Sequence, residues 1–296
     1  MTDTRDETAE RLLRASLPHS YDPDLHLDWD APHDPDRYWM PPRRSSLYGT
    51  PMWDALGRAG QIELTKHEVA SAASGGVWFE TILMRMLTRE YYDMDPRSRH
   101  AQYALTEIAD ECRHSVMFGR LVEALGTPLY RASRRDHMLG RYLVATARGA
   151  HMYAAILIAE EVLDAIQREI MVDDSLQPLI RMVSRIHVVE EARHVRFARE
   201  ELVRQVFGLS PARRAHAQLV IGRSAALIAG RLTHPAVYAS VGLDPATARA
   251  AARANPAFRA TLAWAGRKVV AFLGEQGLVG GPGGFLWRRS GLLGEA

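Results

Sequence analysis

Two short segments of the sequence repeat the same arrangement of an acid and a histidine. Glu111 precedes His114 and Glu191 precedes His194, with the letters E-x-R-H in both segments. In a helix, a three-residue step returns a side chain to within about 60° of its starting direction, so each carboxylate points the same way as its imidazole. One such pair is usually a surface ion pair. Two copies on separate helices are what a helical bundle needs in order to hold two metal ions.

A bundle of this kind also requires a carboxylate from each of its other two helices. Glu80 is the candidate on the first helix, because it is a lone acid in an otherwise apolar run. Glu90 lies near the end of the same predicted helix, and we expect it to face solvent. On the third helix the candidates are Glu160 and Glu161, which their apolar neighbours do not distinguish.

A third histidine lies on the same predicted helical face as the second pair. His187 precedes Glu191 by four residues and His194 by seven, and both steps keep it on that face. The spacing fits a metal ligand, a partner of a ligand, or a buried histidine bonded to a carbonyl group, and it does not choose among them.

The elements that would position these groups follow from apolar periodicity. Apolar residues recur at three- and four-residue spacing in four segments, which predicts four long helices in series at residues 64–92, 98–126, 136–172 and 174–207. Asp173, Asp174 and Ser175 offer an N-cap for the fourth helix. We therefore predict an all-α fold with a four-helix bundle core.

The segments on either side of this core differ from it in composition. Residues 18–52 are rich in proline and contain Trp29, Tyr38 and Trp39, which predicts an extended N-terminal arm that packs by its aromatic side chains. Ser210-Pro211 starts additional helices that reach about residue 274, and the glycine-rich residues 277–284 are predicted to be a loop. The expected organisation is one domain over residues 1–296, with an arm (1–60), a four-helix core (64–207), and additional helices and a tail (211–296).

Composition excludes several classes of protein. The chain has 296 residues, of which 47% are hydrophobic and 24% charged, as in folded globular proteins. Cys112 is the only cysteine, so a disulfide scaffold is excluded and a reducing compartment is expected. A net charge of +2 argues against a nucleic-acid partner. Because the N-terminus is acidic and no apolar run is long enough to span a membrane, we expect a cytoplasmic protein with no membrane partner.

These motifs resemble the p-aminobenzoate N-oxygenase (AurF-type) family of ferritin-like diiron oxygenases, over nearly the whole chain. The resemblance includes Leu47-Tyr48-Gly49-Thr50-Pro51, Trp78-Phe79-Glu80 and residues 105–114, and it is strongest at residues 185–194. This family carries an additional histidine four residues before the last glutamate, a position that His187 fills. The resemblance implies a ferritin-like fold and metal ligation by seven residues: Glu80, Glu111, His114, Glu160, His187, Glu191 and His194.

The donor types suit iron, manganese or zinc, and the resemblance implies two iron ions, with manganese possible. It further implies activation of dioxygen and oxygenation of an arylamine nitrogen to hydroxylamine, nitroso or nitro products, as in natural-product biosynthesis, by a homodimer. The sequence has no nucleotide-binding motif and no cysteine set for an iron-sulfur cluster, so an external electron donor is expected. Leu83, Met84, Phe118 and Leu157 are candidates to line the substrate pocket.

Four alternative functions are also compatible with some of these observations. A diiron hydroxylase or desaturase would use the same ligands on a carbon substrate. A ferroxidase or iron-binding ferritin-like protein needs little chain beyond four or five helices. A radical-generating subunit would be expected to have a tyrosine where Phe118 stands. If the acids and histidines hold no metal, the chain is a non-enzymatic helical interaction protein.

Overall fold

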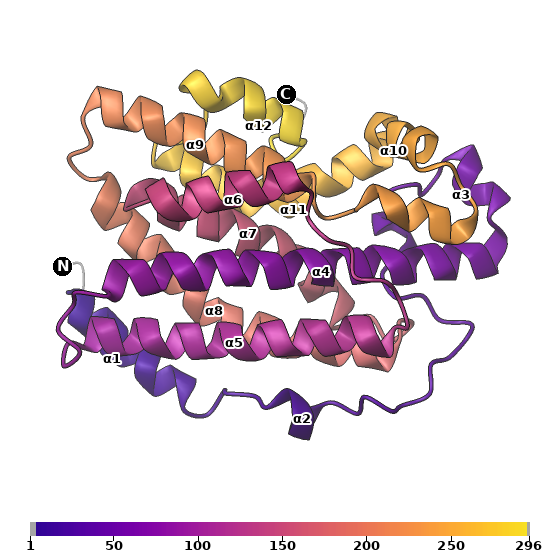
Figure 1. Ribbon diagram of the computed structural model, residues 1–296, viewed down its shortest axis with the longest axis horizontal. Coiled ribbons are helices and arrows are strands. Elements are labelled where there is room, and N and C mark those ends of the chain that lie inside the picture. Colours follow the sequence, from indigo (N-terminus) through magenta and orange to yellow (C-terminus); the bar gives the residue numbers. More distant parts are fainter. Residues whose placement is uncertain (1–3, 295–296) are drawn as a thin grey trace.

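Four long helices form the centre of the molecule. The computed structural model describes residues 4–294, and within that range it contains helices and no strand. The four helices are α4 (Gly57–Tyr91), α5 (Arg99–Ala124), α7 (Ala150–Ile170) and α8 (Pro178–Val206). Helix α4 packs along α5 and α7 packs along α8, while α5–α8 and α4–α7 contacts join the two pairs (Figure 1). The predicted all-α fold with a four-helix core is confirmed.

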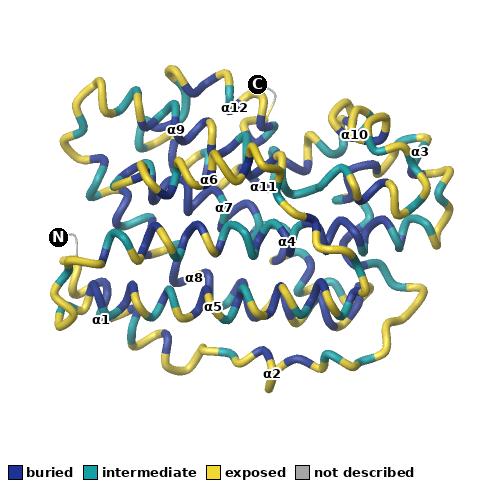
Figure 2. Tube along the Cα trace, viewed as in Figure 1, coloured by how far each residue is buried: buried dark blue, intermediate teal, exposed yellow. Residues whose placement is uncertain are grey.

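Burial within the core follows the helical period. On α5, for example, the buried positions include Tyr103, Glu107, Glu111, His114 and Phe118, at steps of three or four residues. Figure 2 shows buried positions recurring along each of these helices, with exposed positions concentrated on the periphery. Several buried positions are ionisable, so the core is not a purely apolar one.

The predicted helix at residues 136–172 is wrong, because the structure divides it into α6 (Arg134–Thr146) and α7. The chain turns between them at Gly149, whose backbone angles (φ 56°, ψ −134°) disfavour residues with a side chain. Helix α6 packs on the outer side of α4, and only α7 joins the core. The core is therefore formed by α4, α5, α7 and α8.

The fourth core helix also begins later than predicted. Asp173 accepts a hydrogen bond from the backbone N–H of Ser175 (3.0 Å) within a turn and does not cap a helix. Helix α8 begins at Pro178, a residue whose fixed φ suits the first helical turn and whose missing N–H costs nothing there.

The N-terminal arm is partly helical. It opens with α1 (Arg5–Ser16), which the arm's composition did not predict and which a capping box between Thr4 and Glu7 starts. Helix α1 packs on α5 and α8. The rest of the arm passes along the bundle, interrupted by α2 (Pro23–His26), η1 (Pro42–Arg44) and α3 (Pro51–Ala55).

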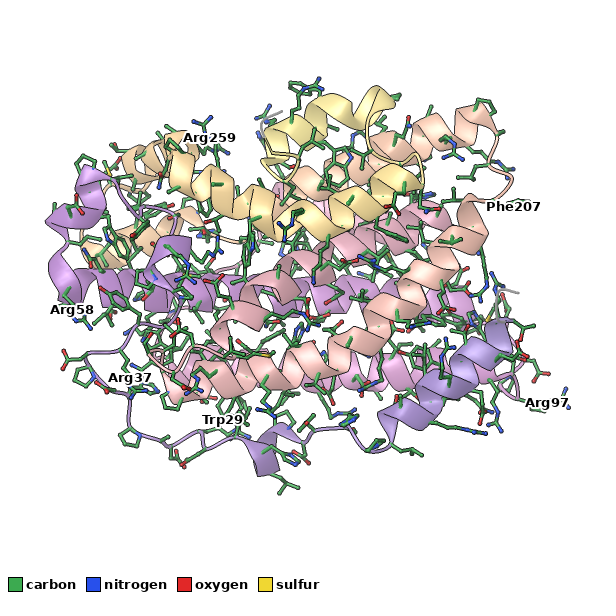
Figure 3. All side chains as sticks on the ribbon, turned by 180° about the vertical axis from the view of Figure 1, so that it is seen from behind. Trp29, Arg37, Arg58, Arg97, Phe207 and Arg259 are labelled. Atoms are coloured by element: carbon green, nitrogen blue, oxygen red, sulfur yellow. The ribbon has the colours of Figure 1, made fainter. Side chains whose placement is uncertain are left out.

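The extended part of the arm is held by both aromatic and backbone contacts. Figure 3 labels Trp29 and Arg37 on this stretch. The guanidinium of Arg120 lies 4.7 Å from the centre of the Trp29 ring, and the Trp39 side chain is buried. The carbonyl of Tyr38 accepts a hydrogen bond from the N–H of Gln177 (3.1 Å). The predicted packing of the arm by its aromatic residues agrees with these contacts.

The C-terminal helices pack on α7 and on the end of α4. They are α9 (Pro211–Ala229), η2 (Pro235–Val241), α10 (Pro245–Ala254), α11 (Pro256–Glu275), η3 (Gly281–Gly283) and α12 (Gly284–Ser290). Helices α9 and α11 pack on α7. The predicted glycine-rich loop contains η3, and it is followed by α12, which buries Trp287 and leaves Phe285 exposed. Among residues 4–294, no helix has the length and apolar character needed to cross a membrane.

Candidate metal centre

All seven residues that the sequence singled out lie together inside the bundle. Each is at most 3% exposed, although four of the seven are acids and the other three are histidines. Their donor atoms form overlapping groups in which the atoms lie within 4.8 Å of one another. These groups are Glu80–His114–His187, Glu111–His114–Glu191 and Glu160–His187–Glu191, with a further group of Glu107, Glu111 and His194. The cluster therefore contains a residue from every core helix.

The two E-x-x-H motifs face each other across α5 and α8. His114 Nδ1 lies 3.0 Å from Glu111 Oε2 and 3.1 Å from Glu191 Oε1. His194 Nδ1 lies 3.0 Å from Glu191 Oε1 and 2.9 Å from Glu111 Oε1. The Nδ1 atom of each imidazole is thus close to both glutamates, the arrangement expected of a carboxylate pair shared by two metal positions.

His187 is oriented by a side chain of α7. Its Nδ1 lies 2.7 Å from Gln167 Oε1, an atom that only accepts hydrogen bonds, so Nδ1 carries the proton and Nε2 has the free lone pair. That Nε2 lies 3.7 Å from Glu80 Oε1 and 3.8 Å from Glu191 Oε1. The hydrogen bond to Gln167 orients the ring so that the Nε2 lone pair faces the acids. Hydrogen bonds to metal-binding histidines orient their rings in the same way.

The structure distinguishes the two acids that spacing left equivalent. Glu160 is buried in the cluster with His187 and Glu191. Glu161 points elsewhere and accepts hydrogen bonds from Arg199 (2.6 and 2.8 Å). Glu90, the rejected candidate on α4, is only partly buried and belongs to none of the groups.

Two buried acids other than the seven predicted ligands form hydrogen bonds with the histidines of the E-x-x-H motifs. His114 Nε2 lies 2.8 Å from Glu190 Oε2, and His194 Nε2 lies 3.1 Å from Asp110 Oδ2. Each acid directly precedes the glutamate of one motif and reaches the histidine of the other. Sequence reasoning missed them, although an acid before each E-x-R-H was visible as the signal.

The N-terminal arm closes the outer side of this layer. The backbone N–H of Tyr21 donates to Glu190 Oε1 (2.9 Å). Arg193 donates to the carbonyl of His19 (3.2 Å), and Arg113 donates to the hydroxyl of Ser20 (3.0 Å). Both arginines are also paired with Asp110. Three consecutive arm residues therefore bind the groups that hold the cluster histidines.

Glu107 is an eighth ionisable group of the cluster that sequence reasoning did not assign. It lies one helical turn before Glu111 and is 1% exposed. Its Oε2 has no hydrogen-bond partner among residues 4–294. Burial raises the pKa of Glu107 to about 8, which favours the neutral acid at neutral pH.

The carboxyl groups of the cluster disfavour one another's ionised form. Burial, and then repulsion from Glu111, raises the pKa of Glu80 well above its ordinary value. Burial, and then repulsion from Glu191, does the same to the pKa of Glu160. Two divalent cations would balance the charge of four ionised carboxylates and remove the cause of both shifts.

The histidines divide into two kinds. Burial acts to lower the pKa of His114 and of His194, but neighbouring carboxylates outweigh it and raise both pKa values. These are chiefly Glu111 and Glu190 for His114, and Glu191 and Glu111 for His194. Burial lowers the pKa of His187 to about 4, so this imidazole is neutral. A neutral imidazole with a free lone pair is the form that binds a metal ion.

Unpaired polar atoms in the cluster provide a direct test of whether these residues fit metal ions. Glu80 Oε2, Glu191 Oε2 and His187 Nε2 are buried without a hydrogen-bond partner among residues 4–294. Unpaired buried polar atoms are costly, so such atoms call for a missing partner. Carboxylate oxygens and imidazole nitrogens are ligands of iron and manganese. The donor set therefore fits a dinuclear metal site.

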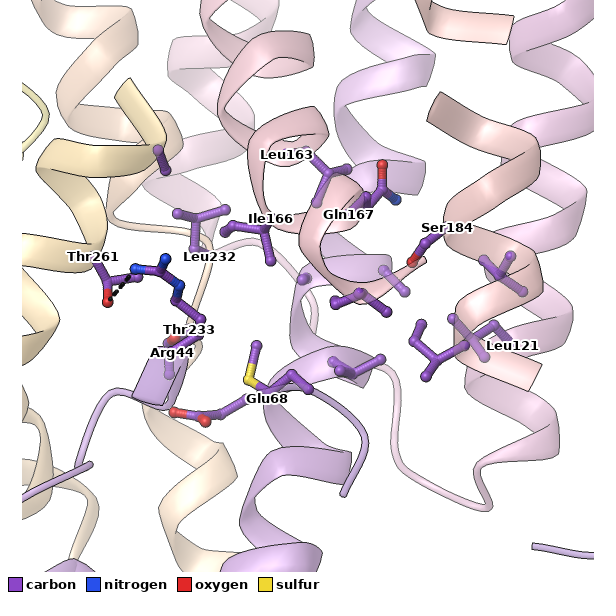
Figure 4. A pocket seen from close by; sticks show the side chains of 18 of the residues that line it. Arg44, Glu68, Leu121, Leu163, Ile166, Gln167, Ser184, Leu232, Thr233 and Thr261 are labelled. Atoms are coloured by element: carbon purple, nitrogen blue, oxygen red, sulfur yellow. Dashed lines mark hydrogen bonds between the residues drawn. The ribbon is translucent and has the colours of Figure 1, made fainter. Parts of the chain in front are cut away.

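A cavity adjoins the His187 side of the cluster. It encloses about 750 Å³, including its opening to solvent, and is lined mainly by apolar residues. Phe118, whose ring centre lies 4.9 Å from that of His187, and Gln167, which binds His187, form part of its wall. Figure 4 shows Gln167 and Ser184 on one side of this cavity and Arg44, Glu68 and Thr261 on the other.

A second, smaller apolar cavity of about 410 Å³ is lined by Glu160, Leu83 and Phe79, among others. Of the four residues proposed from the sequence to line a pocket, Phe118 lines the larger cavity and Leu83 the smaller one, while Met84 and Leu157 line neither.

Comparisons with known proteins give the family. A family model described as P-aminobenzoate N-oxygenase AurF matches residues 2–277. Uncharacterized proteins of Mycobacterium bovis and Mycobacterium tuberculosis are 32% identical over 203 residues, which is 66% of this chain and 60% of theirs. The match thus spans less than two thirds of the length of these relatives.

Among solved structures, a variant of an R2-like ligand-binding oxidase with an aerobically reconstituted Mn/Fe cofactor aligns with a TM-score of 0.47 at 12% identity, over 98% of this chain and 90% of that one. The family model includes all four core helices and every residue of the cluster. The chain therefore belongs to the p-aminobenzoate N-oxygenase AurF family.

Proposed function

We propose that this protein is a diiron oxygenase that activates dioxygen and oxygenates the nitrogen of an arylamine. The observation that carries the proposal is the buried cluster of three imidazoles and four carboxylates, with donor atoms that have no protein partner. Family membership favours iron over manganese and nitrogen over carbon.

Seven residues would hold the two ions: Glu80, Glu111, His114, Glu160, His187, Glu191 and His194. The bound ions would supply the activation of dioxygen, using electrons from an external donor. Glu111 and Glu191 lie between the two E-x-x-H histidines and are the candidates to contact both ions. His187, oriented by Gln167, would give one ion an additional neutral donor.

The rest of the site would control orientation and water. Asp110 and Glu190 hold the Nε2 atoms of the histidines, so that Nδ1 faces the ions. Phe118 and its apolar neighbours keep the cavity beside His187 poor in water, which protects reactive species and strengthens electrostatic interactions. An aromatic substrate would lie in this cavity with its amine toward His187.

The apolar cavity beside His187 favours an oxygenase over a ferroxidase, because iron oxidation alone needs no space for an organic molecule. A carbon hydroxylase or desaturase would use the same ligands and a similar cavity, so it is the second candidate. The acceptor atom must be decided by product analysis.

The expected partners are an external reductase and a second copy of the chain. The outer face of α6 exposes Met138, Leu139 and Tyr142, each more than half exposed, as one apolar stripe that a homodimer would cover. Light scattering on the purified protein tests this expectation, and a monomeric mass would reject it.

The deciding experiment uses protein produced with supplemental iron. After reduction and exposure to oxygen, a panel of arylamines and matched alkylarenes is analysed by mass for added oxygen. Hydroxylamine, nitroso or nitro products support the proposal. Products oxygenated only on carbon would contradict the proposal and favour a carbon hydroxylase instead.

The matched control for this experiment is a pair of neighbouring acids. Glu160→Gln is expected to abolish product formation, whereas Glu161→Gln, which alters only the ion pair with Arg199, is expected to retain it. Equal activity in both variants would contradict the assignment of Glu160.

A further inference from the structure

The larger cavity has two chemically different ends. Its inner end lies at Gln167 and Phe118, which contact His187. Its other end lies at Arg44 and Glu68 (Figure 4). Most of the wall between them is apolar. A ligand that fills this cavity therefore needs an apolar body and a polar group at the end away from the metal centre.

Among the described residues that line this cavity, Glu68 is the only one with a carboxylate, and it is 2% exposed. Its Oε1 accepts a hydrogen bond from the backbone N–H of Ser46 (2.9 Å). Its Oε2 has no hydrogen-bond partner among residues 4–294. Burial raises the pKa of this carboxyl, although the neighbouring Ser46 and the Ser45 hydroxyl act to lower it. An unpaired buried acceptor in the wall of a cavity points to a ligand that supplies the donor.

The nearby cation, Arg44, is already paired with Glu169, a carboxylate that it shares with Arg43. Arg44 donates from Nε to Glu169 Oε2 (2.9 Å), and its Nη2 lies 2.8 Å from the same oxygen. Its guanidinium also stacks on Trp264 at 3.6 Å from the ring centre. Because the Arg44 guanidinium already contacts Glu169 and Trp264, it is expected to bind an incoming anion more weakly than a guanidinium without these contacts.

The distance between the two ends sets the length of the ligand. Glu68 and Glu80 are twelve residues apart on α4, which corresponds to about 18 Å along the helix axis. A ligand that reaches from Glu68 to Phe118 and Gln167 at the inner end is therefore expected to be longer than one aromatic ring, and a ring with a short side chain fits better.

We propose that this cavity selects an elongated aromatic substrate whose far end carries a hydrogen-bond donor, a primary amine or a hydroxyl, which Glu68 Oε2 receives. This inference rests on the proposed function for the direction of the substrate, with its reacting amine at the His187 end. It makes Glu68 a specificity residue that disfavours substrates ending in a carboxylate.

The test measures binding without turnover. The purified full-length protein, kept under nitrogen, is titrated calorimetrically with phenylbutylamine, phenylbutanol and phenylbutyrate, which share one apolar body and differ in the terminal group. We expect the amine and the alcohol to bind at least about tenfold more tightly than the carboxylate, the ratio that corresponds to ~1.4 kcal/mol. Tighter binding of the carboxylate would overturn the proposal without any variant.

Two variants locate the effect. Glu68→Gln should reduce the preference for the amine at least about tenfold, whereas Glu63→Gln, an exposed acid on the same helix, should leave it unchanged. Ala72→Phe, which fills the cavity, should weaken all three ligands and keeps the test valid if Glu68→Gln does not fold. An unchanged order of affinities in a folded Glu68→Gln protein would contradict the role of Glu68.

Failure of this inference and failure of the proposed function are separable. Binding is measured without oxygen, so the order of affinities does not depend on oxygenation. Donor-selective binding in a protein that oxidises no arylamine would reject the proposed function alone. Arylamine oxidation without donor selectivity would reject the role of Glu68 alone.

Discussion

The α5 and α8 halves of the metal centre share one pattern and differ at one position. Residues 110–114 and 190–194 both read acid, glutamate, any residue, arginine, histidine, and each acid supports the histidine of the other half. Four residues before the glutamate, however, α8 has His187 and α5 has Glu107. The scaffold is therefore nearly symmetric, while the donors it presents are not.

This difference determines what each half can offer a metal ion. His187 is neutral with a free Nε2, and Gln167 holds its ring in place. Glu107 has a pKa of about 8 and lies near Glu111. A fixed imidazole is a ready ligand, whereas a carboxyl group in its neutral form is a poor one. The two metal positions are therefore expected to be unequal, with the additional donor and the larger cavity on the same side.

The largest effect is expected where the two halves meet. Glu111→Ala and Glu191→Ala each remove a carboxylate that lies within 3.1 Å of both E-x-x-H imidazoles, so each should lose most of both ions. Elemental analysis of the purified variants measures this, against about two ions per chain in the parent protein. Glu161→Ala is the control and should keep its metal. A full complement of metal in either variant would show that these carboxylates are not shared.

The second prediction compares the position at which the halves differ. His187→Ala should lose one ion and retain the other, while Glu107→Ala should retain both, because only His187 presents a free donor atom in its metal-binding form. Metal content and Mössbauer spectra of iron-loaded protein measure the outcome, and circular dichroism checks that the helices remain. Equal metal loss in the two variants would mean that the halves are equivalent.

The third prediction concerns the acids that support the histidines. Asp110→Asn and Glu190→Gln should each weaken metal binding by about 10- to 100-fold, the usual effect of removing a partner of a metal-bound histidine. Asp110 also pairs with Arg113 and Arg193, so its variant should show the larger loss. Competition with a chelator measures the affinities, with the exposed Glu123→Gln as control. An affinity equal to that of the control would reject the supporting role.

Much of this asymmetric centre was predictable because its residues lie on single helices at fixed spacing. The repeated E-x-R-H motif, His187 and Glu80 follow from side chains that share a helical face, and the structure brings them together. The choice of Glu160 over Glu161 was not decidable from spacing, because both have apolar neighbours and only the position of Arg199 separates them. That the seven residues bind metal remains a prediction.

What sequence reasoning missed depends on contacts between helices or on single residues. Asp110 and Glu190 serve the histidine of the other helix, a relation that periodicity within one helix does not reveal. Gly149 divides a continuous apolar pattern, and a lone glycine in such a pattern does not by itself end a helix. Glu107 was detectable, since it lies on the face of Glu111 one turn away.

The smallest effect is expected from the arm, which touches the two halves differently. It contacts the α8 acid directly, through the N–H of Tyr21 on Glu190, and the α5 acid only through Arg113 and Arg193. Tyr21→Pro removes that N–H, while Tyr21→Ala keeps it. Losing one hydrogen bond to a supporting acid should cost ~1 kcal/mol of metal binding, or about fivefold in the rate of metal loss to a chelator.

A proline at another position of the arm is the control. It distinguishes loss of the Tyr21–Glu190 hydrogen bond from a general loosening of the arm. Leu25→Pro alters α2, where the N–H of Leu25 bonds only to Asp22, and it should leave the rate of metal loss unchanged. If Tyr21→Pro and Leu25→Pro accelerate metal loss equally, the arm protects the centre merely by covering it. If Tyr21→Pro alone does so, the arm stabilises the α8 half through Glu190, and the asymmetry of the centre extends to its outermost layer.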